Sequence, residues 1–583
     1  MGHGSMGYGG AIFLLICWLC SIAVGQSSLM VQIRNGTLEG SVMTSRKGRE
    51  FDAFRGIPFA QKPIGELRFE PPKPFGSWTG VRSAKEDSNF CIQRQGDGFI
   101  GDEDCLYLNV YRPKSASGCQ KKYPVMVFIH GGGFSEGSAH SGFYGPEYLL
   151  DQDVVLVTTN YRLGALGFLS TEDLVAPGNQ GLKDQGQAIR WVHENIAAFN
   201  GDPNSVTIFG ESSGAGSVHL HMISPKVRGL FHRAIMESGD VLAPGALNRP
   251  GIGKNQSTTV GQILGCPTDR SSALISCLKT KKAVDIFGIQ CPDQLFPNCS
   301  VVAFRPVIEP AHPGAYITGE PAEAVMSGKV ANVPWMTGIN AQEGAVVAAG
   351  IYGPADQHND RILDENFMKY APITMGYDET RPEEFKNNVT ERLRKFYLGD
   401  KKIDESTRWN VINMYTDTWF YIGSQTSVSV HLQTLTAPVY YYYFAYRGTS
   451  SFSELFGDPS RNYGAAHADE LLYLFPVRRL LFPNSTVSEE DHKMIDVMTT
   501  LWVNFARSGD PTPKRCPVIP AKWTPVRTSS LQYLRIENSR DIRMADNLLA
   551  DRVNFWAGIP YCKLNEGTNC DYPIGRNVLK KTK

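Results

Sequence analysis

The stretch "VTIFGESSGAGSVH", residues 206–219, constrains the fold of this chain more than any other. An apolar run ends at Gly210, Ser212 follows two residues later, and Gly214 follows after two more before a helical pattern begins. A serine framed in this way is typical of a strained turn from a strand to a helix, where a Cβ atom at either glycine would block the close approach of strand and helix. The pattern predicts that Ser212 is a nucleophile.

The adjacent Ser213 lacks this setting, because its own neighbours at two residues are Glu211 and Ala215, which carry Cβ atoms. We expect Ser213 to offer its backbone N–H to an oxyanion while its hydroxyl is nearly dispensable. Ser217 is expected to be an ordinary helix residue.

Short runs of apolar and β-branched residues recur before and at this turn. Such runs are expected of strands that are covered on both faces of a parallel sheet. They are "YPVMVFIH" (123–130), "VVLVTTNYR" (154–162) and "SVTIFG" (205–210).

A helix is predicted between the last two runs, within "LKDQGQAIRWVHENIAAF" (182–199), where Ile189, Val192 and Ile196 fall on one helical face. Strand, helix and strand at this spacing predict a parallel α/β sheet. The run "APVYYYYFAY" (437–446) either continues this sheet or caps it, because propensity does not distinguish the two.

A glycine triplet directly follows the first predicted strand, in "FIHGGGFSEG". Glycines without Cβ atoms let backbone N–H groups converge on one point, as an oxyanion hole requires. The sequence therefore predicts an oxyanion hole formed by Gly132, Gly133 and Ser213, with His130 beside it in a structural role. The alternative is a flexible loop.

Composition narrows the classes of partner. Lys and Arg together number 58, as do Asp and Glu, so the charge balance gives no reason to expect nucleic acid. Hydrophobic residues make up 42% of the 583 residues, which is globular composition. The length alone would suggest several domains.

Several features predict export. Residues 11–25 form an apolar run that ends in small residues, as a signal peptide of residues 1–25 does, and it is short for a membrane span. The polar tail from about residue 563 contains neither a lipid-anchor signal nor a retrieval sequence. N-glycosylation sequons occur at Asn35, Asn255, Asn298, Asn388 and Asn484.

The cysteines also indicate an oxidising compartment. After removal of the leader, several of them lie in short-range pairs that predict disulfides, and no spacing predicts a metal site. The pairs are Cys91 with Cys105, Cys266 with Cys277, Cys291 with Cys299, and Cys562 with Cys570, which leaves Cys119 and Cys516 as free thiols or as a pair.

From about Val31 to Trp556 the chain resembles the type-B carboxylesterase and cholinesterase family of α/β-hydrolases. The resemblance implies a single domain over residues 26–583, built on a large, mostly parallel sheet flanked by helices. It is carried by "FRGIPFAQKPIGELRFEPP" (54–72), "EDCLYLNVYRP" (103–113), "NYRLGALGFLS" (160–170), "GNQGLKDQ" (178–185) and "FGESSGAGSV" (209–218), which stand in the family's order.

The resemblance also implies the partners of Ser212. The family's acid lies in a segment that here reads "GINAQEG", which points to Glu343, and its histidine opens "HADE", which points to His467. His467 would accept the proton of Ser212 while Glu343 holds the imidazole. The resemblance further pairs Cys91 with Cys105 and Cys266 with Cys277.

Departures from the family bear on the substrate. The loop between Cys91 and Cys105 lacks the tryptophan that binds choline in cholinesterases, so choline esters are disfavoured. The segment after Glu343 is aliphatic, so we expect Val346 and Val347 to line the pocket. Near residues 552–556 the chain also lacks the cysteine of the family's third disulfide.

The chain is most similar to insect secreted carboxylesterases. We therefore expect a secreted serine esterase that hydrolyses neutral carboxylic esters through an acyl-enzyme, without a metal, cofactor or membrane anchor. One alternative is an enzyme of the juvenile hormone esterase type, although those usually carry Gln where this chain has Glu211. The other is a cholinesterase-like adhesion protein that has lost its chemistry.

Overall fold

The fold is described from a computed structural model. It covers residues 29–114, 121–243, 245–289, 304–353, 357–377, 382–527 and 531–559. The expected leader, the sequon at Asn298, the pairs Cys291–Cys299 and Cys562–Cys570, and Cys119 lie outside these residues.

A sheet of eleven strands crosses the molecule in the order β16-β15-β14-β13-β12-β11-β9-β10-β8-β4-β3. Its strands run parallel from β10 through β15, and antiparallel pairs close it at both edges. The bounds are β3 (Ser41–Thr44), β4 (Glu50–Pro58), β8 (Tyr107–Pro113), β9 (Tyr123–Ile129), β10 (Val155–Thr159), β11 (Gly201–Glu211), β12 (Arg233–Glu237), β13 (Trp335–Asn340), β14 (Val439–Phe444), β15 (Tyr533–Asn538) and β16 (Asp541–Ala545).

The three predicted strands are the central strands β9, β10 and β11, and nearly every residue of β9 and β10 is buried. Their continuous apolar character follows from coverage on both faces. The run at 437–446 continues the sheet as β14, between β13 and β15. The fold class predicted from the sequence is thus confirmed.

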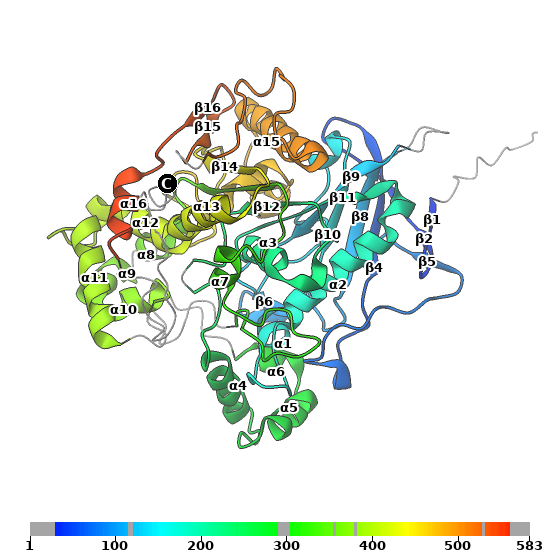
Figure 1. Cartoon of the computed structure of the whole chain (residues 1–583), viewed down its shortest axis with the longest axis horizontal. Coiled ribbons are helices and arrows are strands. Elements are labelled where there is room, and N and C mark those ends of the chain that lie inside the picture. The colour runs from blue at the N-terminus through cyan, green and yellow to red at the C-terminus, as the bar shows by residue number, and fades with distance from the viewer. Residues whose placement is uncertain are drawn as a thin grey trace, which may run out of the picture.

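Helices pack around this sheet (Figure 1). The predicted helix is α2, and its Ile189 and Val192 are fully buried, as is Ile196, which directly follows the helix. The bounds are α1 (Gly164–Phe168), α2 (Gln180–Asn195), α3 (Ser213–Ile223), α4 (Ile252–Ile263), α5 (Ser271–Thr280), α6 (Ala283–Phe287), α7 (Pro321–Met326), α8 (Ala345–Tyr352), α9 (Asn359–Glu365), α10 (Phe367–Thr374), α11 (Glu383–Tyr397), α12 (Arg408–Thr416), α13 (Ile422–Thr434), α14 (Arg478–Leu481), α15 (Glu489–Ser508) and α16 (Ala550–Trp556).

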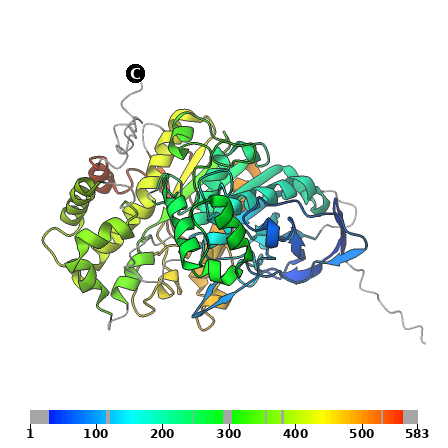
Figure 2. The same cartoon turned by 90° about the horizontal axis from the view of Figure 1, so that it is seen from below.

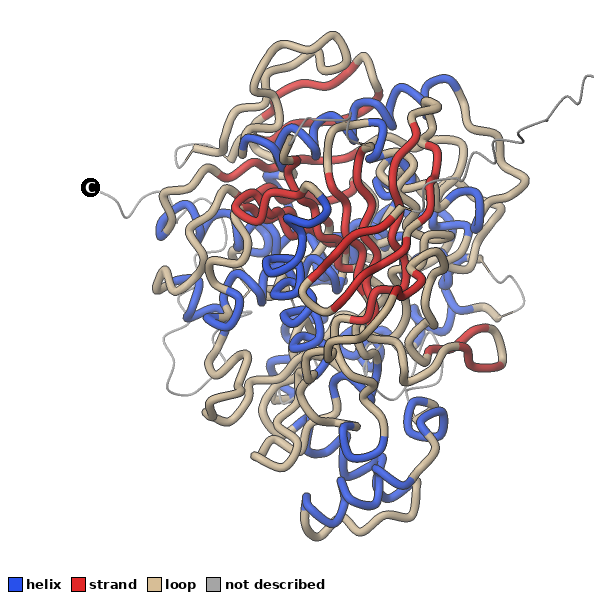
Figure 3. The backbone as a smooth tube through the Cα atoms, turned by 90° about the vertical axis from the view of Figure 1, so that its right-hand side faces the viewer, coloured by secondary structure: helices blue, strands red, loops and turns tan. Residues whose placement is uncertain are grey.

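The helices α9, α10 and α11 lie at one end of the molecule. A small sheet of β1 (Met30–Ile33), β2 (Gly36–Glu39) and β5 (Val81–Ser83) lies at the other end, as Figures 1 and 2 show. The main sheet twists between them (Figure 3). Within the described residues, no helix is both long and apolar enough to cross a membrane.

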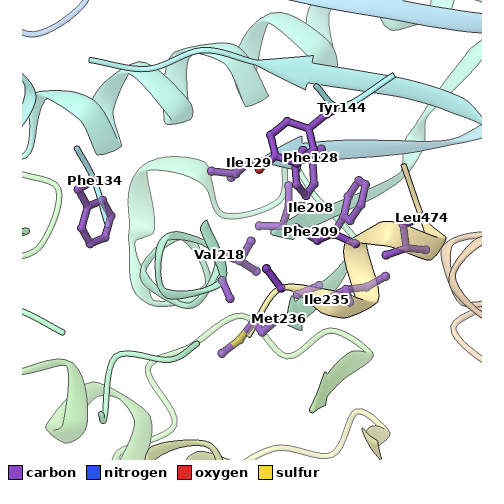
Figure 4. Close-up of a cluster of buried hydrophobic side chains, with 14 of the residues drawn as sticks. Phe128, Ile129, Phe134, Tyr144, Ile208, Phe209, Val218, Ile235, Met236 and Leu474 are labelled. Carbon is purple, nitrogen blue, oxygen red and sulfur yellow. The ribbon is translucent and has the colours of Figure 1, made fainter. Parts of the chain in front are cut away.

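The core next to the carboxyl ends of β9 and β11 combines aromatic and aliphatic side chains (Figure 4). The ring of Phe128 on β9 packs on Phe209 of β11 at 4.9 Å between centroids, and on Tyr144 and Phe475 at 4.7 and 4.6 Å. These rings give the strand ends a rigid base, and in parallel sheets ligands bind at these ends.

Candidate active site

Ser212 occupies the strained turn that the sequence predicts. It follows β11 directly and adopts φ 57° and ψ −124°, a conformation that is unfavourable for a residue with a side chain. A Cβ atom at Gly210 would lie 2.5 Å from the carbonyl oxygen of Ile129, and one at Gly214 would lie 2.1 Å from the same oxygen. The two glycines are therefore required because β9 passes directly against the turn.

The glycine triplet follows β9 and borders the turn. Gly132 and Gly133 have positive φ angles of 98° and 58°, and both line the same cavity as Ser212 and Ser213. The hydroxyl of Ser213 accepts a hydrogen bond from the N–H of Phe134 at 3.3 Å. This contact was not expected from the sequence, and it ties the glycine loop to the first turn of α3.

His130 precedes the triplet and is buried. Its ring stacks on Tyr161 at 4.4 Å between centroids, and Nδ1 lies 2.8 Å from the carbonyl oxygen of Gly131. Burial lowers its pKa to about 4, against which the backbone hydrogen bond acts. A neutral, packed imidazole fits the structural role predicted for it.

Glu343 and His467 meet in the structure, although 124 residues separate them. Nδ1 of His467 lies 2.6 Å from Oε2 of Glu343, and the other carboxylate oxygen of Glu343 accepts the N–H of Asn340 at 2.7 Å. Glu343 is fully buried and follows β13, so the end of that strand sets the position of the carboxylate.

The loop that carries His467 is held by side-chain hydrogen bonds. The carboxylate of Asp469 accepts the N–H groups of Ala466 and Phe452 at 2.8 and 2.7 Å. The ring of His467 packs on Phe420 at 4.5 Å between centroids, and its residue is 7% exposed. The imidazole is thus oriented from three sides.

The second ring nitrogen of His467 contacts a residue that the sequence analysis did not include in the site. Nε2 lies 3.1 Å from Oε1 of Glu211, the residue just before Ser212. Within the described residues, Ser212 and His467 form no hydrogen bond with each other, although both line one cavity. The position between Gly210 and Ser212 was the only signal in the sequence that could have identified Glu211.

Four buried glutamates interact through their charges, and two of them, Glu211 and Glu343, contact this imidazole. We call them the carboxyl cluster: Glu211, Glu237, Glu343 and Glu470. Burial, and then the charges of Glu343 and Glu237, raise the pKa of Glu211 well above its usual value. Burial raises the pKa of Glu237 to about 8, although the indole N–H of Trp502 donates to it at 2.9 Å. Burial and the neighbouring carboxylates likewise raise the pKa of Glu470. The protonated forms of Glu211, Glu237 and Glu470 are therefore favoured.

The cavity above these residues has a volume of about 930 Å³. Val346 lines it, but Val347 does not: its side chain packs into the hydrophobic core and is 7% exposed. The prediction for Val347 was wrong because consecutive residues of helix α8 point in different directions. The lining is also more aromatic than expected. Its aromatic residues are Phe90, Phe134, Phe143, Tyr144, Trp419, Phe420, Phe452 and Phe456.

The disulfide Cys91–Cys105 closes the loop at one wall of this cavity. The loop forms a hairpin of β6 (Gln93–Gln95) and β7 (Gly98–Ile100), and the Gln93 amide exchanges two hydrogen bonds of 2.9 Å with the backbone of Gly137. The hairpin is thereby fixed to the glycine loop.

The disulfide Cys266–Cys277 links the segment that follows α4 to α5, and Cys516 is a free thiol. Among the described residues, no group of three His, Cys, Asp or Glu side chains is arranged to hold a metal ion.

The described sequons differ in accessibility. Asn255 on α4, Asn388 on α11 and Asn484 are exposed. Asn35 is half-buried, and its amide donates a hydrogen bond to the carbonyl oxygen of Phe75 at 2.8 Å.

Known proteins are similar to this chain over most of its length. The sequence model of the carboxylesterase family matches residues 27–556. A carboxylic ester hydrolase of Bombus ignitus is 36% identical over 90% of this chain and 93% of its own length. The juvenile hormone esterase of Tribolium castaneum is 35% identical over 93% of this chain and 95% of its own.

A solved structure is also similar. It is the crystal structure of juvenile hormone esterase from Manduca sexta with OTFP covalently attached, which has a TM-score of 0.78 and 26% sequence identity. The match covers 91% of this chain and 99% of that one. The present chain is an α/β-hydrolase that belongs to the carboxylesterase family, and it is a serine carboxylesterase.

Proposed function

We propose that Ser212, His467 and Glu343 are the residues with which this carboxylesterase hydrolyses neutral esters to an acid and an alcohol. The observation that carries the proposal is the 2.6 Å contact between the buried Glu343 and His467, which lines the same cavity as Ser212. A nucleophile at a strained turn, a base and a buried acid that orients the base are the parts that acyl transfer needs.

In this mechanism Oγ of Ser212 attacks the ester carbonyl carbon while Nε2 of His467 takes its proton. The alcohol leaves with that proton, and an acyl group stays on Ser212. A water molecule then gives one proton to His467 and attacks the acyl carbon, which releases the acid and restores the serine. Glu343 holds Nδ1–H, so that Nε2 of the neutral imidazole keeps a lone pair for the proton.

The N–H groups of Gly132, Gly133 and Ser213 would bind the oxyanion of the tetrahedral intermediate. Both glycines have positive φ angles, a backbone conformation that a residue with a side chain could not easily adopt. This conformation supports the role, because it turns the peptide backbone toward the cavity. Ser213 begins α3, so the positive end of the helix dipole adds to the stabilisation of negative charge.

The two adjacent serines provide the test. Ser212→Ala should lower kcat toward p-nitrophenyl butyrate by about 10⁴-fold or more, since the nucleophile is lost. Ser213→Ala should retain activity within about tenfold, because its N–H remains while the N–H of Phe134 loses one acceptor. Mass spectrometry after organophosphate treatment should locate the label on Ser212. Full turnover by Ser212→Ala would disprove the proposal.

A neutral substrate follows from the cavity walls, which are largely aromatic and aliphatic. A hormone-degrading enzyme is the second candidate, supported by the similarity to two juvenile hormone esterases. A panel of acetate, butyrate, longer acyl and juvenile-hormone-type esters separates the two. One ester preferred by orders of magnitude in kcat/KM would favour the specific enzyme over the generalist.

We further propose that the protein is a single-domain, secreted glycoprotein whose first 25 residues are removed. The exposed Asn255, Asn388 and Asn484 support glycosylation, and the two disulfides support an oxidising compartment. Sequencing the N-terminus of the protein from an expression medium tests the cleavage. Enzymatic removal of N-glycans followed by peptide mapping identifies the occupied sites.

A further inference from the structure

Two leucines on the wall of the cavity are exposed at the surface. Leu455 is 49% exposed and Leu480 is 56% exposed, and both line the cavity that contains Ser212. A single exposed leucine is ordinary. Two exposed leucines that belong to the wall of a binding cavity mark one place where that cavity reaches the surface; the exposed Arg94 and Gln95 mark another.

The two leucines come from neighbouring segments. Leu455 follows the 3₁₀ helix η7 (Phe452–Glu454), and Leu480 lies in α14. The ring of Phe452 packs against Phe482, just beyond α14, at 6.2 Å between centroids. We therefore treat Leu455 and Leu480 as one apolar rim.

The charged residues next to Leu480 on α14 are paired with acidic residues, and these ion pairs hold the helix in place. On α14, Arg478 is buried beside Asp491 at 3.3 Å, and Arg479 pairs with Glu147 at 2.7 Å. The rim can therefore present apolar side chains without burying an unpaired charge.

Other apolar side chains line the same cavity. The half-buried Phe143, Phe456 and Leu481 belong to the lining, as do Leu471 and Ala468, which lie close to His467 in sequence and are buried. With the rim they give the cavity apolar surface against which a chain of carbon atoms can lie.

We infer that the apolar rim of Leu455 and Leu480 binds the far end of a long apolar chain and sets a preference for long-chain esters. This inference rests on the proposed function of Ser212. Short esters fill only the inner cavity, whereas a longer acyl or alcohol chain reaches the rim and removes both leucines from water. Each methylene group that becomes buried in this way contributes about fourfold to kcat/KM.

The experiment compares the slope of activity against chain length in matched variants. The substrates are p-nitrophenyl butyrate and p-nitrophenyl decanoate, both kept below the concentration at which the decanoate aggregates. The variants are Leu455→Ser, Leu480→Ser and the double variant. Leu174→Ser is the control, because Leu174 is 68% exposed and does not line the cavity.

We expect the ratio of kcat/KM for decanoate over butyrate to fall about tenfold or more in the double variant. Each single variant should lose part of the ratio. The control Leu174→Ser should retain it, and so should a further variant, Leu480→Met, which keeps an apolar side chain at the rim. An unchanged ratio in the double variant would overturn the inference. A second series with decanoate above its aggregation concentration is run in parallel. A loss seen only in that series would also overturn the inference, because the rim would then contact a lipid surface and not a single chain.

A failure of the inference about the rim can be distinguished from a failure of the proposed function. If Ser212→Ala hydrolysed butyrate at the rate of the unaltered protein, the site itself would be wrong. If Ser212→Ala were inactive and the double variant kept its chain-length ratio, only the rim would be wrong.

Discussion

The two sides of the active site are held in place by different forces. On the side of Ser212 the backbone is packed so closely that a Cβ atom at Gly214 would lie 2.1 Å from a carbonyl oxygen. On the side of His467, side-chain hydrogen bonds and the buried carboxyl cluster hold the imidazole. The first side should therefore be sensitive to added volume, and the second to charge and protonation.

The largest effect is expected on the second side. Glu343→Gln should lower kcat by about 10⁴-fold, because an amide in place of the carboxylate can donate to Nδ1 and favour the wrong tautomer of His467. Steady-state kinetics with p-nitrophenyl butyrate measures the loss.

Glu470→Gln is the matched control, since Glu470 is equally buried and accepts a hydrogen bond from Asn340 that a glutamine oxygen can also accept. It should cost less than about tenfold. Equal losses in the two variants would contradict a specific role for the contact between Glu343 and His467.

The first side is tested by adding one methyl group. Gly214→Ala should destabilise the fold by on the order of 3 kcal/mol, because its Cβ would collide with the backbone of β9, which cannot give way. Gly216→Ala, on the same helix, has nothing within 4 Å of its new Cβ and should be neutral or slightly stabilising. Thermal unfolding measures both. Equal melting temperatures would show that the turn has room.

The turn at Ser212 could be predicted from the local sequence, whereas Glu343 and His467 were predicted only from the resemblance to the family. The turn at Ser212 follows from a local pattern, because the preceding strand and the two flanking glycines together predict a tight turn from strand to helix. The contact between Glu211 and His467 depends on a loop that lies far along the chain from Glu211. No local pattern reports such a contact. The same reason explains why the aromatic lining from Trp419, Phe452 and Phe456 was missed.

Glu237 tests whether the carboxyl cluster makes stability depend on pH. Its pKa is raised to about 8 from 4.5, chiefly by burial, so the folded protein holds a proton that the unfolded chain releases above pH 4.5. Its contribution to stability is full below that pH and is lost as pH rises through about 8, at up to about 1.4 kcal/mol per pH unit.

Glu237→Gln should therefore gain stability relative to the unaltered protein as pH rises from 5 to about 8, by on the order of 2 kcal/mol. The glutamine oxygen can still accept the hydrogen bond from Trp502. Glu66→Gln is the control, since the side chain of Glu66 is 95% exposed. Denaturant unfolding at several pH values gives the free energy of unfolding of each protein. If the plots of this free energy against pH run parallel for Glu237→Gln and the unaltered protein, Glu237 does not titrate in this range.

The smallest effect is expected at Glu211, where the two sides meet. Its pKa is raised, first by burial and then by Glu343 and Glu237, so the protonated, neutral form is favoured, and its Oε1 lies 3.1 Å from Nε2 of His467. Glu211→Gln is neutral in the same way, and kcat/KM should stay within about tenfold at neutral pH. As pH rises, only the unaltered enzyme places an anion beside Nε2, so the two pH profiles should diverge on the alkaline side. Profiles that superimpose up to the alkaline limit of stability would mean that Glu211 does not titrate in the working enzyme. The contact between Glu211 and His467 would then be steric, and the charge of Glu211 would have no effect on catalysis.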